Sequence, residues 1–121
     1  MLKKAVLVIS HGSRSSKTKE EVVQLLEHLK GKTDFNILEY AFLEIESPSI
    51  PEGIDRCVKQ GADEIAVLLN FLNSGRHVDE DIPVIVEQCR QKYPSVRIKV
   101  SRPVGQHPGM VDLFSDLIQS T

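Results

Sequence analysis

The chain has 121 residues, of which 40% are apolar and 26% charged, as expected for a single globular domain over residues 1–121. Fifteen basic residues face seventeen acidic ones, and this formal net charge of -2 argues against a nucleic-acid partner. The apolar runs are no longer than a strand, which argues against a membrane span.

The N-terminal segment and the cysteines bear on the compartment in which the protein is expected. The N-terminal segment has an apolar run but no small-residue cleavage site, so we expect a first strand rather than a signal peptide. Cys57 and Cys89 are the two cysteines, and they do not form a CxxC motif. We therefore expect buried thiols in a cytoplasmic protein.

Strand and helix patterns alternate four times along the chain. The expected elements are, in chain order, a strand over 5–9, a helix from 18 to 31, a strand over 36–43, a helix from 47 to 61, a strand over 64–70, a loop over 71–81, a helix beginning near 83, a strand over 96–100 and a helix from 108. Thr18 and Glu21 have the spacing of a capping box for the first helix. Ser47 and Pro48 are expected to open the second.

This order of elements predicts an α/β fold with a four-stranded parallel sheet and helices on both faces. By analogy with flavodoxin-like sheets, we expect the strand order 2-1-3-4. The fourth strand is the most polar and should lie at an edge. In such sheets ligands bind beyond the carboxyl ends of the strands, where the strand order reverses.

Four candidate residues follow the four strands and should meet at this edge. They are His11, Glu44, His77 and His107, after the first, second, third and fourth strand. Imidazole and carboxylate groups are ligands of borderline divalent ions such as Fe²⁺, Co²⁺, Ni²⁺ and Zn²⁺. Two histidines and one glutamate would leave coordination positions open for an exchangeable ligand. The sequence thus predicts a metal site with open coordination.

Each candidate also has a structural interpretation. A histidine after a strand can simply bond to backbone, and His107, which precedes a proline, can mark a turn. Glu44 can cap the second helix or pair with an arginine. Glu80 lies in an acidic segment that can begin a helix or help to handle a metal. His28 lies among charged residues of a helix and is expected at the surface.

Three segments of the chain resemble the CbiX-type and sirohydrochlorin chelatase family. They are VISHGSR at 8–14, FLE at 42–44 with Pro48 after it, and NFLNSGRHVDEDIP at 70–83. The third has the form FL..G.H...DIP and is the most specific, whereas many strand ends carry HGS. The chain departs from many members at Leu69-Asn70, where proline and an aliphatic residue are common.

The resemblance implies a chelatase-like fold in its short, class II form. It implies an enzyme that inserts Co²⁺ or Fe²⁺ into sirohydrochlorin without ATP or an organic cofactor, towards cobalamin or sirohaem, or with Ni²⁺ towards a related cofactor. His11 and His77 match the family's catalytic, metal-binding histidines, and Glu44 an acidic residue of its second-strand motif. The residues expected to contact the carboxylates of the tetrapyrrole are Ser13, Arg14, Ser74, Gly75 and Arg76.

Other functions use the same residues. A non-enzymatic carrier of metal or tetrapyrrole is the main alternative. A phosphotransfer enzyme is disfavoured because Ser10, rather than an arginine, precedes His11. Related chelatases often have two α/β lobes, whereas this chain has one and no internal repeat. We therefore expect a homodimer whose strand-end edges face each other.

Overall fold

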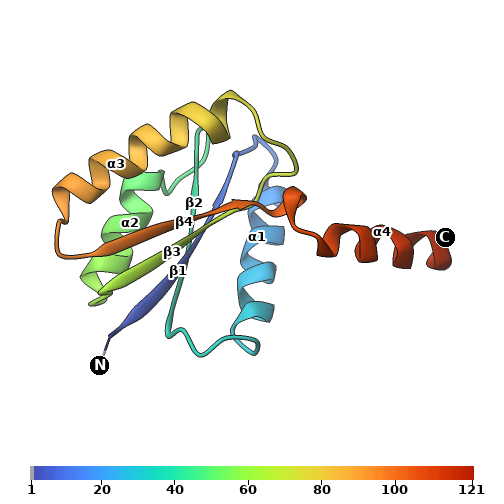
Figure 1. The fold of residues 1–121 in the computed structure, drawn as a ribbon, viewed down its shortest axis with the longest axis horizontal. Coiled ribbons are helices and arrows are strands. Elements are labelled where there is room, and N and C mark those ends of the chain that lie inside the picture. The colour runs from blue at the N-terminus through green and yellow to red at the C-terminus, as the bar shows by residue number, and fades with distance from the viewer. Residues whose placement is uncertain (1) are drawn as a thin grey trace.

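The computed structural model describes residues 2–121 and contains one parallel sheet in the order β2-β1-β3-β4 (Figure 1). The strands are β1 (Lys4–Ser10), β2 (Ile37–Phe42), β3 (Glu64–Leu69) and β4 (Arg97–Pro103). The helices are α1 (Ser16–Leu29), α2 (Ile50–Lys59), α3 (Ile82–Lys92) and α4 (Gly109–Ser120), with a π-helical turn η1 (His77–Asp81) and a 3-10 turn η2 (Val104–Gln106). The predicted α/β class, strand order and edge position of the fourth strand are confirmed.

The larger core lies between the sheet and the pair α2 and α3. Alternate residues of β1, such as Leu7, point into it because successive side chains of a strand face opposite sides. Gly53 lets α2 approach closely, since a Cβ there would lie 2.9 Å from the Cβ of Ala41. Cys57 and Cys89 are buried free thiols in this core, as predicted, and burial raises the pKa of Cys57 to about 12.

α1 covers the opposite face of the sheet (Figure 1). Leu26 of α1 packs with Val6 and Val8 of β1 in a smaller core. α4 forms as predicted but extends away from the sheet, so that its apolar side chains are exposed (Figure 1). Among residues 2–121, no helix has the length and apolar character that crossing a bilayer requires.

The first helix begins earlier than predicted. Ser15 is the residue before α1, and its extended backbone ends the loop that follows β1. Thr18 therefore lies inside the first turn, and the predicted capping box of Thr18 and Glu21 is wrong. The spacing was compatible with a cap, but the chain is already helical three residues before Glu21.

The second helix begins later than predicted, because a better cap follows Ser47 and Pro48. The Oγ of Ser49 accepts a hydrogen bond from the backbone N–H of Glu52 at 3.3 Å. The Glu52 carboxylate in turn accepts from the backbone N–H of Ser49 at 2.9 Å. This reciprocal capping box satisfies two backbone N–H donors. The hydrogen bond from the Ser49 backbone, and then the one with its side chain, lower the pKa of Glu52.

Candidate metal centre

The loops after β1 and β2 stay paired beyond the ends of the strands. The backbone N–H of Leu43 donates to the carbonyl of Ser10 at 2.9 Å, and that of Glu44 donates to the carbonyl of His11 at 3.1 Å. The two side chains therefore leave neighbouring backbone positions at the carboxyl edge of the sheet. The Nε2 atom of His11 lies 2.9 Å from Oε1 of Glu44. The expected meeting of these residues is found.

Two unusual backbone conformations support this pairing. Gly12 has a φ of 108°, and a Cβ at this position would lie 1.9 Å from the carbonyl oxygen of Glu44. Only glycine fits such a turn without moving its neighbour. Ile45 has a φ of 72°, a conformation that a β-branched residue rarely adopts. The chain thus turns sharply on either side of the contact between His11 and Glu44.

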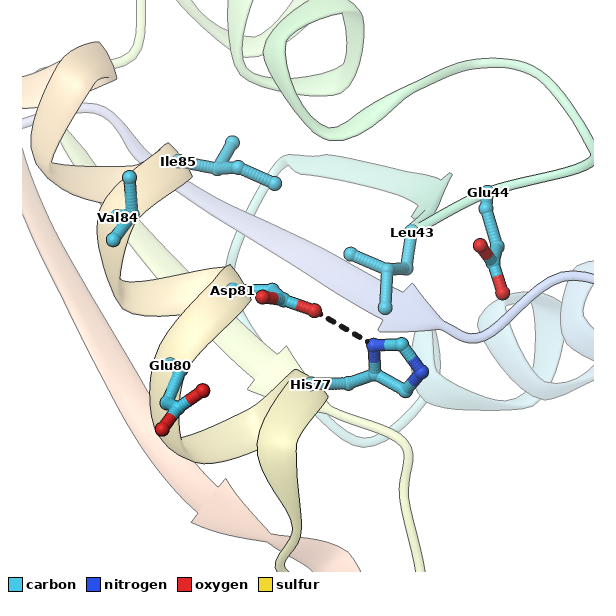
Figure 2. Close-up of a pocket in the computed structure, with 7 residues that line it drawn as sticks. All are labelled: Leu43, Glu44, His77, Glu80, Asp81, Val84 and Ile85. Atoms are coloured by element: carbon cyan, nitrogen blue, oxygen red, sulfur yellow. Dashed lines mark hydrogen bonds and ion pairs between the residues drawn. The ribbon is translucent and has the colours of Figure 1, made fainter.

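His77 reaches the same place from a segment that was predicted to be a loop. Residues 77–81 instead form the π-helical turn η1, which runs directly into α3. The turn places Asp81 beside His77, and the Nδ1–H of His77 donates to Oδ2 of Asp81 at 2.8 Å. This bond leaves the lone pair of Nε2 free, and Figure 2 shows that nitrogen on the side of the ring that faces Glu44.

His11, Glu44 and His77 form a group whose ligand atoms all lie within 4.8 Å of one another. The rings of the two histidines are 5.1 Å apart between centroids. Bonds of about 2.1 Å to one ion require ligand atoms somewhat closer than this, so small side-chain movements complete the site. The side chains are 46%, 49% and 46% exposed, so the site is open to a large ligand.

A cavity of about 430 Å³ adjoins this group (Figure 2). Leu43, Val84 and Ile85 form its apolar part. Its polar lining comes from Glu44, His77, Glu80 and Asp81. A site with an apolar wall next to metal-ligating groups can bind the flat face of a macrocycle while an ion is presented to it.

The other candidates are less closely placed. Glu80 does not join the three-residue group; its carboxylate lies 3.5 Å from Nε of Arg76 at the surface. The Nδ1 of His107 accepts a hydrogen bond from the backbone N–H of Gly109 at 2.8 Å, which agrees with the turn interpretation. His28 is exposed on α1, as predicted.

The residues expected to bind carboxylates lie in the loops around the group. The backbone N–H of Ser13 is already bound to the carboxylate of Glu46 at 2.8 Å. Arg14 is exposed, and Ser74 accepts a hydrogen bond from the side chain of Gln106. A Cβ at Gly75 would meet nothing within 4 Å, so a close approach of backbone is evident at Gly12 and not at Gly75.

Asp81 is a functional residue that the sequence does not distinguish within the acidic segment after His77. A loop over 71–81 fixes no distance between the two side chains. The available signal was the spacing of four residues between histidine and aspartate, which brings two side chains together only if the segment is helical.

Comparison with known proteins agrees with the motifs. The family model CbiX matches residues 5–121. The chain belongs to the CbiX family. The resemblance inferred from the sequence is therefore confirmed.

Relatives that are named chelatases differ in length. The sirohydrochlorin ferrochelatase of Bacillus subtilis is 39% identical over 104 residues, which are 86% of this chain and 40% of that protein. The sirohydrochlorin cobaltochelatase of Sulfolobus acidocaldarius is 32% identical over 111 residues, 92% of this chain and 86% of that protein. The chain thus spans less than half the length of the first relative and most of the second.

Solved CbiX-like structures have the same fold. The sirohydrochlorin chelatase SirB of Bacillus subtilis subspecies spizizenii, in complex with cobalt, matches with a TM-score of 0.88 and 34% identity, over 98% of this chain and 51% of that one. A CbiX protein from Marinobacter aquaeolei matches with a TM-score of 0.82 and 24% identity, over 97% of this chain and 95% of that one. The second match concerns the fold alone.

Proposed function

We propose that this chain inserts Co²⁺ or Fe²⁺ into sirohydrochlorin, without ATP. The observation that carries the proposal is the group of His11, Glu44 and His77 at the open edge of a CbiX fold. Relatives named sirohydrochlorin ferrochelatase and cobaltochelatase support the substrate. Ni²⁺ is a further candidate ion, because histidine and carboxylate ligands discriminate poorly among these metals.

In this proposal the metal ion is a substrate that the protein holds briefly. Nε2 of His77 has a lone pair for the ion, since Nδ1 donates to Asp81. Nε2 of His11 and the Glu44 carboxylate lie opposite it, and the ion replaces the proton in their 2.9 Å contact. Three ligands leave coordination positions for the pyrrole nitrogens, which capture the ion from the other side.

Insertion also releases two protons, because the macrocycle loses two N–H protons when it binds a divalent ion. As the ion leaves the protein, the nitrogens of His11 and His77 regain free lone pairs. Each can then accept a proton from a pyrrole nitrogen, which is general base catalysis. Glu44, 2.9 Å from His11, is the acceptor that returns the proton to solvent at the exposed side of the site.

The substrate is a polycarboxylate, and the proposal assigns its binding to the surrounding loops. Arg14 and Arg76 are exposed beside the edge and can form charge-assisted bonds to carboxylates. Ser13, Ser74 and Gly75 offer further polar contacts. We also propose that the enzyme needs no organic cofactor, has no nucleic-acid or membrane partner, and acts in the cytoplasm, as its two free cysteines favour.

We further propose that the chain acts as a single-domain homodimer. A single open edge leaves much of a large flat substrate in contact with water. A second copy whose strand ends face the first would cover the other side of the macrocycle. The SirB chain that this fold matches is about twice as long, which supports a need for two such units.

The test is anaerobic insertion of Co²⁺ or Fe²⁺ into sirohydrochlorin, followed by tetrapyrrole absorption. His11→Ala and His77→Ala should each lower the rate by ~100-fold or more, the usual contribution of a positioned acid–base group. His28→Ala, an exposed histidine on α1, is the matched control and should retain the rate. An uncatalysed rate with wild-type protein, or full activity of both site variants, would disprove the proposal. A single turnover per chain would identify a carrier instead.

A further inference from the structure

α4 is an amphipathic helix whose apolar side has no cover from its own sheet. One side carries Met110, Val111, Leu113, Phe114, Leu117 and Ile118, and the other Asp112, Ser115, Asp116 and Gln119. Five of the apolar side chains are 57% to 76% exposed. A helix with this pattern is normally stable because its apolar side is packed against something. α4 therefore lacks its packing partner.

The sheet has a matching uncovered region on the face that carries α1. α1 packs against β2 and the adjoining core residues of β1, which leaves the β3–β4 half of that face open. There Ala66 pairs with Lys99 in the sheet register, and Leu68 points to the same side. Ala66 and Leu68 are only half-buried, and Lys99 is exposed. A hollow of about 270 Å³ at Leu68 continues this region to the carboxyl edge.

The segment before α4 prevents the helix from covering this face in its own chain. The backbone N–H of Gly105 donates to the carbonyl of Phe71 at 3.0 Å, and the side chain of Gln106 bonds to Ser74. The fit is tight, since a Cβ at Gly105 would lie 1.7 Å from the carbonyl oxygen of Leu72. These contacts direct α4 outward from the carboxyl edge of the sheet (Figure 1). A return to its own β3–β4 face would break them.

The buried area fits a second copy. Charge does not contribute, because Lys99 and Arg97 lie 3.5 Å and 3.9 Å from Glu64 of β3 and the aspartates of α4 lie on its polar side. The five exposed apolar side chains offer on the order of 600 Å² per helix, taking roughly 200 Å² for a large side chain. Two helices on two receiving faces would bury on the order of 2,400 Å², more than the roughly 1,600 Å² of a standard interface.

We propose that α4 of each copy packs on the β3–β4 half of the α1-side face of a second copy, in a reciprocal exchange of helices. A closed two-fold dimer satisfies both helices at once. α4 leaves from the edge that carries His77, so the exchange also brings the partner to the candidate metal centre. This inference deepens the homodimer proposed above, but its tests measure assembly rather than metal insertion, so either proposal can fail alone.

The first test compares two variants by sedimentation equilibrium. Leu117→Asp places a charge on the apolar side of α4, and Ser115→Asp places the same charge on its polar side. Wild type and Ser115→Asp should be dimers at micromolar concentration, and Leu117→Asp should raise the dissociation constant by at least ~30-fold. Circular dichroism checks that both variants keep their helices. A monomeric wild type, or a dimer that Leu117→Asp leaves unchanged, would overturn the proposal.

The second test locates the contact. One chain carries Lys99→Cys and another Leu117→Cys, and a short bismaleimide is added to their mixture; the native thiols are buried and do not react. Cross-linked pairs that contain one chain of each kind support the exchange. A doubly substituted chain that cross-links only within itself shows that α4 folds back, and absence of any mixed pair shows that it binds elsewhere. Either result rejects the proposal.

Discussion

Removal of the Asp81 carboxylate should weaken metal binding without removing a metal ligand. Asp81 accepts the Nδ1–H of His77 at 2.8 Å, so it fixes the tautomer and the orientation of the ring. In Asp81→Ala the ring can rotate, and its proton can move to Nε2, the atom assigned to the ion. Loss of such an outer partner typically costs between 10-fold and 100-fold in metal affinity.

The exposure of His77 and Asp81 decides where in this range the loss of metal affinity should fall. The side chains of His77 and Asp81 are 46% and 43% exposed, so water can replace part of the lost bond. We therefore expect the lower limit, ~10-fold weaker binding of Co²⁺, or about 1.4 kcal/mol. Asp81→Asn keeps an oxygen acceptor and should lie between wild type and Asp81→Ala. The assay is titration with Co²⁺, followed by its visible absorption, at one fixed pH.

Asp79→Ala is the matched control for this prediction. It removes the same charge from the same turn, two residues away and likewise near the positive end of α3. If Asp79→Ala and Asp81→Ala weaken Co²⁺ binding equally, the effect is one of general charge and the positioning role of Asp81 is wrong. A visible spectrum of bound Co²⁺ that changes only in the Asp81 variants would support it.

Two further substitutions test the backbone and the packing. Gly12→Ala should lower the free energy of unfolding in urea by about 1–3 kcal/mol, because a Cβ would lie 1.9 Å from the carbonyl of Glu44 at a φ of 108°, whereas Gly75→Ala should have no effect. Tyr93→Phe removes the hydrogen bond from the Tyr93 hydroxyl to Asp55 and should lower the free energy of unfolding at pH 7. That bond is the main reason why the pKa of Asp55 lies below its ordinary value of 3.8, so the stabilisation is present above 3.8 and is lost as the pH falls through the lowered pKa. Denaturation curves of the two proteins should therefore converge in strong acid, and a constant difference at every pH would contradict this explanation.

The sheet was predictable because hydrophobic pattern and chain direction decide it. Continuous apolar runs such as 5–9 predict buried parallel strands, and the reversal of strand order predicts where His11 and His77 meet. The sequence predicts that Glu44 and His11 lie near each other, but not that their side chains are in direct contact. The 2.9 Å contact depends on the backbone turns at Gly12 and Ile45, which no periodicity encodes.

Other features escaped prediction because alternatives of similar energy compete for them. Ser47 stands directly before Pro48 and Ser49 two residues before Pro51, and both resemble helix caps. The reciprocal bonding with Glu52 makes Ser49 the cap. The residues at 77–81 show no apolar periodicity that would predict a helix. They form a helical turn because they are continuous with α3. The direction of α4 depends on where the segment around Gly105 is bound, which is a tertiary contact.

The three candidate ligands come from three different segments, each after a different strand of the sheet: His11 and Glu44 from loops and His77 from the turn η1. An ion bound to all of them would be a cross-link between β1, β2 and the entry to α3, in a protein with no covalent link between these segments. No short stretch of this sequence can reproduce that link, because His11, Glu44 and His77 become neighbours only when the sheet has formed. Metal affinity should therefore be coupled to the tertiary fold, and under the proposed function each release of the ion would also remove a constraint on the relative motion of the segments around the product.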